Sequence, residues 1–116
     1  MKHTKEQLQG MSDFEVNYAL ADLIGFKEIK KSGDSGLILD WHSTPPGFKI
    51  NKADYCNNPS DIMPLAFEHG IHFGPQHKAW YAIHDASMLS ENPIEAESES
   101  PLRAIACCLI LVLQDK

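Results

Sequence analysis

The segment Leu102–Leu113 limits the fold of this chain more than any other, because it is apolar on almost every side. Ser100 and Pro101 precede it, and a serine N-cap followed by proline in the first turn is typical of a helix start. A helix with almost no polar face is normally buried on most sides. Its uninterrupted apolar run, Ala104–Leu113, is far shorter than the roughly 20 residues that cross a bilayer. We therefore expect a soluble protein with this helix at the centre of its core.

Two sequences near the N-terminus predict further helix starts. Thr4–Gln7 and Ser12–Glu15 both have the spacing of a capping box, in which a hydroxyl and a carboxylate or amide satisfy free helix N–H groups. After the second, apolar residues recur at helical spacing up to Gly25, and glycine is the usual residue at a left-handed helix end. We expect a helix at about 12–24, with an extra turn before Gly10.

Apolar runs separated by turn sequences predict about four short strands. Residues 26–31 and "LILDW" flank the turn "SGDSG" and read as a hairpin, while "GIHF" and "KAWYAIHD" flank "GPQHK". Between the pairs, Asn58 and Pro59 are a typical helix start, and we expect a helix at 59–69 that ends at Gly70. "STPPG" should stop regular structure. Residues 48–58 are expected to be irregular, and the acidic stretch 86–100 a surface loop.

These elements predict one α+β domain over residues 1–116. A small antiparallel sheet of about four strands packs with three helices, and the C-terminal helix is central to the core. A chain of this length is large enough to bury such a core. We find no internal repeat and no sign of a domain boundary.

Charge and cysteine content narrow the function classes. Ten basic and sixteen acidic residues give a net charge of −6, which argues against nucleic acid as a partner, since a phosphate backbone requires a basic face. The three cysteines are an odd number and two are adjacent, so we expect reduced thiols in a cytoplasmic protein. The N-terminus lacks the apolar centre of a signal peptide.

The residues that could bind a metal or attack a substrate do not form a convincing set. His69 and His72 have HxxH spacing, but Gly70 lies between them and should place them on different elements, so we expect neither a metal site nor a cofactor. Cys107 and Cys108 should be inert within an apolar helix. Cys56 precedes a helix N-terminus that would favour a thiolate, although a packed core thiol is the simpler interpretation.

Aromatic and histidine side chains on the predicted strands are the remaining candidates. Trp80 and Tyr81 are neighbours on one strand, so one ring should face the core. The other is either exposed or, as the simpler interpretation, partly buried beneath the 86–100 loop. An exposed aromatic suits a ligand or a protein partner. His72 and His84 are both expected on an exposed strand face.

Four parts of the chain, in order, resemble the NinX-like family of small phage and prophage proteins. They are "TKEQLQGMSDFEVNYALA" at 4–21, "DYCNNPSDIMPLAFEHGI" at 54–71, the tryptophan at position 80, and "SPLRAIACCLILVLQ" at 100–114. The family opens with a T-x-E-L-x-G-like motif, has a Y-[CS]-x-[ND]-W-like centre that runs into a D-x-x-P-L helix, and closes with an N-P-L-R-A helix. The resemblance covers most of the chain outside residues 27–50.

Two positions depart from that pattern. Pro59 stands where a tryptophan is common, which puts any family aromatic contact there in doubt, and Ser100 replaces a common asparagine while keeping a capping residue. The resemblance implies a phage or prophage origin, and hence the cytoplasm of a bacterial host cell. The family has no assigned catalytic activity, so the resemblance transfers no catalytic residue.

Three hypotheses for function follow. The first is a non-enzymatic phage accessory protein that binds a host or phage protein, or a small anionic ligand. Helix N–H groups at the start of the central helix could hold such an anion, and the expected binding residues are Tyr55, Asn57, Asn58, Asp61, His69 and Trp80. The alternative is a nucleotide-binding or nucleotide-processing protein that uses the same pocket, with Cys56 or His69 taking part. The third is a structural module that forms homo-oligomers.

Overall fold

The computed structural model describes residues 2–25, 29–32, 37–42 and 49–115, and for residues 29–32, 37–42 and 49–52 it describes the backbone alone. The described elements confirm the α+β class. In place of one sheet of about four strands, they form two antiparallel sheets of three strands each. The first contains β1 (Ile29–Ser32), β2 (Leu37–His42) and β3 (Lys49–Ala53), and the second β4 (Ile71–Gln76), β5 (Ala79–His84) and β6 (Glu95–Ser98).

Two of these strands correct the expectations from sequence. Residues 49–53, expected to be irregular, form β3 and pair with β2. Residues 95–98, expected to lie in a surface loop, form β6 and pair with β5. The sequence of β6 is polar except for Ala96, which is buried opposite Ala82, so one small side chain anchors a strand that has no other apolar residue. The predicted β1–β2 hairpin is confirmed, and "STPPG" lies outside the described residues.

The helices begin and end where their capping residues predict. α1 (Lys5–Gln9) and α2 (Asp13–Ile24) both start with a complete capping box, at Thr4 and Ser12. Gly25 closes α2 in the left-handed region with φ 112°, and Gly70 closes α3 (Pro59–His69) with φ 67°. The extra turn expected before Gly10 is α1, which raises the number of helices from three to four. A 3-10 turn, η1 (Asp85–Ser87), follows β5.

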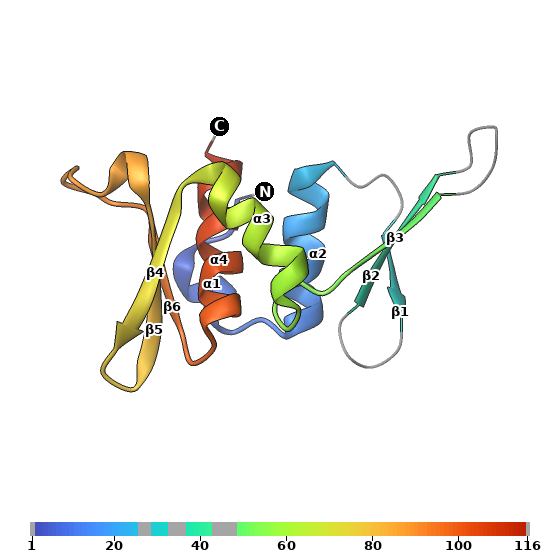
Figure 1. The fold of residues 1–116 in the computed structure, drawn as a ribbon, viewed down its shortest axis with the longest axis horizontal. Helices are drawn as coiled ribbons and strands as arrows, with labels where there is room; N and C mark the ends of the chain where they lie inside the picture. Colours follow the sequence, from blue (N-terminus) through green and yellow to red (C-terminus); the bar gives the residue numbers. More distant parts are fainter. Residues whose placement is uncertain (1, 26–28, 33–36, 43–48, 116) are drawn as a thin grey trace.

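The C-terminal helix α4 (Pro101–Gln114) is central to the core, as expected. The sheet β4–β5–β6 covers one side of it, and α2 and α3 cover the other (Figure 1). Its buried side chains run through eight of its residues, Ala104, Ile105, Ala106, Cys107, Cys108, Leu109, Ile110 and Val112. The apolar character of the segment on nearly all sides therefore reflects contact with two layers at once.

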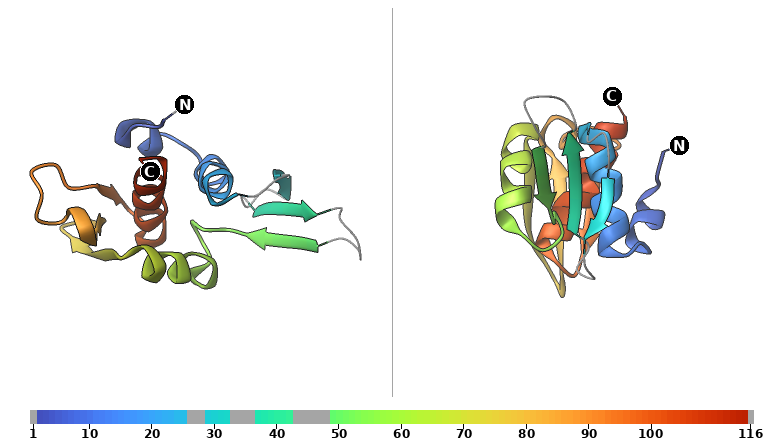
Figure 2. Two further views of the ribbon diagram at one scale, coloured as in Figure 1. Left: turned by 90° about the horizontal axis from the view of Figure 1, so that it is seen from above. Right: turned by 90° about the vertical axis from the view of Figure 1, so that its right-hand side faces the viewer.

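The sheet β1–β2–β3 lies beyond α2, at the opposite end of the molecule from β4–β5–β6 (Figures 1 and 2). The molecule is consequently elongated, with extents of 48 × 28 × 26 Å. None of the helices in the described part of the chain is long and apolar enough to cross a membrane.

Candidate functional site

The segment 54–61, which was expected to bind a ligand, forms a tight polar corner against α2. Asp54 is only 5% exposed, and its carboxylate accepts a hydrogen bond from Asn17 Nδ2 at 2.9 Å. Asn57 Nδ2 reaches both oxygens of the same carboxylate, at 3.1 and 3.2 Å. Asn17 Oδ1 in turn accepts from the N–H of Cys56 at 3.1 Å. These polar side chains therefore hold one another in place.

The start of α3 is held in the same way. The side chain of Asn58 accepts a hydrogen bond from the N–H of Ser60 at 3.0 Å, which makes it the predicted N-cap. Asp61 Oδ2 accepts from the N–H of Asp54 at 2.9 Å. Two of the expected binding groups are thus used to fix the backbone that carries them.

Arg103, in the first turn of α4, ties this corner to the rest of the fold. Its Nη1 donates to Asp13 Oδ1 at 2.7 Å, and its Nη2 donates to the carbonyls of Leu8, at 3.0 Å, and Met11. The other oxygen of Asp13 accepts from Asn57 Nδ2 at 3.3 Å. We name this set, Asp13, Asn17, Asp54, Asn57 and Arg103, the polar corner. It joins the α1–α2 turn to the starts of α3 and α4.

The cysteines are not set up as nucleophiles. Burial raises the pKa of Cys56 far above its ordinary value, and the neighbouring Asp13 carboxylate adds to this effect. Cys56 is 2% exposed, so the simpler interpretation of a packed core thiol is confirmed, and the alternative of a thiolate favoured by the helix N-terminus is not, because loss of solvent outweighs the helix dipole. Burial also raises the pKa of Cys107 to about 11 and that of Cys108 to about 12, so both thiols are protonated at neutral pH.

The six expected binding residues do not form one site. Tyr55, Asn57, Asn58 and Asp61 lie together, although Tyr55 is buried. His69 lies at the other end of α3, about 16 Å from Asn58 at the usual helical rise. Trp80 lies in β5, where it is partly buried and packs against the core.

The two histidines of the sheet β4–β5–β6, His72 and His84, lie on opposite faces. His72 is exposed, as expected, and its Nε2 lies 2.9 Å from Asp85 Oδ1. His84 pairs with Ile71 in the register of β4 and β5, which places it on the core side and not on the exposed face. Among the described residues, no three His, Cys, Asp or Glu side chains are grouped closely enough to hold a metal ion.

A surface that the sequence analysis did not predict lies along the outer edge of β4. Phe67, Phe73, Tyr81 and Met88 line one hollow of about 570 Å³ there. Phe67 is 78% exposed, and Leu89, next to Met88, is 99% exposed. We name these five residues the β4-edge surface. The exposed His72 lines the same hollow, whereas Leu89 lies outside it. Exposed apolar side chains grouped in this way are typical of binding surfaces, because burying them in a partner is favourable.

The two faces of β4 both carry an aromatic ring at this edge. Phe73 lies opposite Ala82 and Gly74 lies opposite Tyr81, so Phe73 and Tyr81 belong to opposite faces of the sheet. The Tyr81 ring lies over Gly74, where an added Cβ would be 3.1 Å from Tyr81 Oη. Glycine at this position therefore lets the ring reach across to the edge of the strand.

The backbone of β4 is also open at this edge. Two hydrogen bonds show which backbone groups face which neighbouring strand. The N–H of His84 donates to the carbonyl of Ile94, next to β6, and the N–H of Asp85 donates to the carbonyl of Gly70, next to β4. It follows that Ile71, Phe73 and Pro75 direct their backbone groups away from β5. Pro75 fits this pattern, since proline in a sheet is confined to positions that need no N–H donor. No described strand pairs with this edge.

Only one of these features had a signal in the sequence. The neighbours Trp80 and Tyr81 predicted one inner ring and a second ring that is either exposed or partly covered, and Tyr81 is the second one, 36% exposed. Phe67 and Leu89 gave no signal, because an isolated apolar residue in a helix or loop is read as a core residue. Their exposure depends on where α3 and η1 meet the sheet.

The comparison with known protein families agrees with the resemblance seen in the sequence. The family described as "Bacteriophage P22, NinX" matches residues 7–114. The match therefore includes the polar corner, the β4-edge surface and the central helix. A search of curated proteins gave no match.

Proposed function

Because the chain belongs to the phage NinX family, we propose that it is a phage accessory protein without catalytic activity, which acts by binding a host or phage protein. The partner contributes an extended apolar segment that adds to the sheet at the edge of β4. This mode of binding combines backbone hydrogen bonds with apolar contacts for alternate side chains.

The open edge of β4, with an apolar ring on each of its faces, is the observation that supports the proposal. Backbone groups of Ile71 and Phe73 are directed outward, and an incoming strand would pair with them. Successive side chains of such a strand point to opposite faces. One set would meet Phe67 and Phe73, and the other would meet Tyr81. Leu89 would extend the contact beyond the strand.

The alternative, a nucleotide site at the start of α3, has less support. An anion there needs free helix N–H groups. The N–H of Ser60 is already bound to the Asn58 side chain, and the Asp61 carboxylate occupies the same turn with a like charge. The high pKa of Cys56 also leaves that side chain protonated at neutral pH.

Site-specific photocrosslinking in the bacterial host tests the proposal. A benzophenone amino acid is placed at Phe67, at Leu89, and at two exposed control positions, Ser60 at the start of α3 and Glu6. We expect Phe67 and Leu89 to crosslink to one and the same protein, which mass spectrometry identifies, and the controls to give no such product. Crosslinking from Ser60 alone would contradict the proposal and favour a site at the start of α3.

A matched pair of variants then tests the strand addition itself. Phe73→Pro removes the outward N–H, while β4 already accommodates a proline at the equivalent position Pro75. Phe73→Leu keeps the N–H and an apolar side chain. We expect Phe73→Pro to lose the crosslink and Phe73→Leu to keep most of it. Equal binding by both variants would show that the backbone of β4 takes no part.

A further inference from the structure

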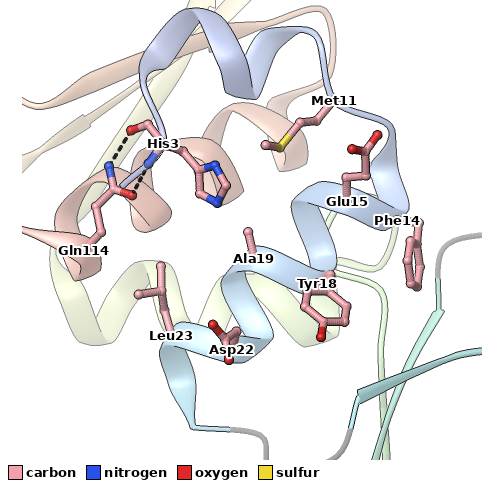
Figure 3. Close-up of a pocket in the computed structure, with 9 residues that line it drawn as sticks. All are labelled: His3, Met11, Phe14, Glu15, Tyr18, Ala19, Asp22, Leu23 and Gln114. Atoms are coloured by element: carbon pink, nitrogen blue, oxygen red, sulfur yellow. Dashed lines mark hydrogen bonds between the residues drawn. The ribbon is translucent and has the colours of Figure 1, made fainter. Parts of the chain in front are cut away.

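A second hollow lies on the other side of the core, between α2 and the N-terminal segment (Figure 3). Its volume is about 330 Å³, within the range of about 300–1,000 Å³ that is usual for small-molecule sites. The face of α2 forms one wall, with Tyr18, Ala19 and Leu23. The His3 ring and the Met11 side chain point into the space from the opposite side.

The wall formed by the N-terminal segment is fixed to α4. The N–H of His3 donates to Gln114 Oε1 at 2.9 Å, and Gln114 Nε2 donates to the carbonyl of His3 at 2.6 Å. A carboxamide that makes both bonds with one residue holds that residue in a single position. The hollow is therefore bounded by two anchored walls and is largely formed before any ligand arrives.

Two carboxylates lie around the hollow. Glu15 and Asp22, two turns apart on the same face of α2, are both among its lining residues. Hydrogen bonds from the backbone and the side chain of Ser12 lower the pKa of Glu15, so its carboxylate is ionised at neutral pH. None of the described lining residues is a lysine or arginine.

Tyr18 lies between these carboxylates along α2, and Phe14 is next to Glu15. Tyr18 is one turn from each carboxylate, and its ring centroid is 6.0 Å from that of Phe14, with the planes tilted by 57°. Tyrosine and phenylalanine faces attract cations, which adds to the attraction of the carboxylates. The lining thus combines an apolar interior with a negative rim.

We propose that this hollow binds a small organic cation, a protonated or quaternary amine with an apolar body. The body lies between Met11, Ala19 and Leu23, and the ammonium group lies near Tyr18 and the carboxylates of Glu15 and Asp22. This site is separate from the β4 edge, so it stands or falls independently of the proposed protein partner.

A titration followed by two-dimensional NMR tests the inference. The probes are tryptamine and benzyltrimethylammonium as cations, and indole-3-propionate as an anion of similar shape to tryptamine. We expect saturable shifts for amides of residues 11–23 with the cations, and none with the anion. Shifts of equal size with the anion, shifts confined to other parts of the chain, or no saturable shift with either cation would overturn the proposal.

Charge-removing variants locate the ammonium group. Asp22→Asn and Glu15→Gln should each weaken cation binding by about threefold, as expected for exposed carboxylates, and Gln keeps the capping box. Glu6→Gln, an exposed carboxylate on α1 outside the hollow, is the control and should leave binding unchanged. Ala19→Leu should abolish binding by filling the space. If Glu6→Gln and Asp22→Asn weakened cation binding equally, the weakening would come from the change in overall charge, which would contradict the assigned site.

Discussion

The polar corner and the β4-edge surface treat their side chains in opposite ways. In the polar corner, the charged and amide groups of Asp54, Asn57 and Arg103 are paired with one another and with the backbone. Along β4, apolar rings such as Phe67 are exposed, and no described strand pairs with the outer edge. The polar groups of the first region are hydrogen-bonded within the protein, and the apolar rings of the second would become buried only by binding a partner.

This difference shows why a concentration of unusual polar residues is a poor guide to a binding site in this chain. A polar group that is buried must be hydrogen-bonded, so residues of this kind are often needed to hold elements together. Exposed apolar groups carry no such structural requirement. Five predictions follow. Changes to the polar corner, to the buried thiols of the core or to the N-cap of α3 should alter stability, and a change to the β4-edge surface should alter binding.

Arg103→Ala should have the largest effect, because it removes the side chain that joins α4 to the α1–α2 turn. Its side chain is only 15% exposed, and loss of one partner from such a network costs about 2–3 kcal/mol of unfolding free energy. Urea denaturation measures the loss. Lys5→Ala, which breaks a partly exposed ion pair with Glu95, is the control. A similar loss in that variant would show that the Arg103 contacts contribute no more to stability than an isolated ion pair.

Asp54→Ala should cost about 2 kcal/mol, because the change removes the acceptor used by both Asn17 and Asn57. Asp54→Asn keeps one acceptor oxygen and should cost less. The same denaturation experiment measures both. If the two variants were as stable as the original protein, the corner would not be structural.

The buried thiols should make the protein less stable at alkaline pH. The pKa of Cys107 is raised to about 11 in the folded state, while an unfolded thiol ionises near about pH 8.5. Below the pKa of the unfolded thiol, both states are protonated, and the contribution of the buried thiol to stability is fully present. As pH rises towards the pKa of the folded state, only the unfolded state loses its proton, so stability falls by about 1.4 kcal/mol per pH unit. Unfolding of Cys107→Ala at pH 8, 9.5 and 10.5 should show a shallower decline, and parallel curves would contradict the burial effect.

Asn58→Ala should cost about 1 kcal/mol through loss of the N-cap of α3. Asn58→Gly should cost only a few tenths of a kcal/mol, because glycine is better tolerated than alanine at an N-cap. Thermal unfolding separates the two. If partner crosslinking disappeared in Asn58→Ala while stability was unchanged, the start of α3 would be a contact site and the comparison would reverse.

Phe67→Ser should have the smallest effect on stability, within about 0.5 kcal/mol, because the ring is mostly in solvent. The same change should abolish the crosslink formed from Leu89. Phe67→Tyr, which keeps the ring, is the matched control. A large loss of stability in Phe67→Ser would mean that the ring supports the fold and is not held for a partner.

The sequence predicts those parts of the fold that depend on neighbouring residues. The helix starts at Ser12, Asn58 and Ser100 each rest on a hydroxyl or amide within three positions of the N–H group it caps, so their signals are local. β3 and β6 could not be found in this way. Their sequences are rich in polar residues, and they become strands by pairing with β2 and β5.

The candidate sites depend on contacts that are still further apart. Asn17 meets Asp54 across 37 positions, and Arg103 meets Asp13 across 90. Without these contacts, Asn57 and Asn58 look like free binding groups. The β4-edge surface likewise combines a helix, two strands and the η1 region, so its residues have no shared sequence pattern.

Amide hydrogen exchange of the protein with and without its crosslinked partner tests the central claim most directly. We predict slower exchange for the outward-facing amides of Ile71 and Phe73 in the complex, because an added strand would accept their hydrogen bonds. Residues 54–61 should exchange at the same rate in both states. Slower exchange confined to residues 54–61, with β4 unchanged, would contradict the account.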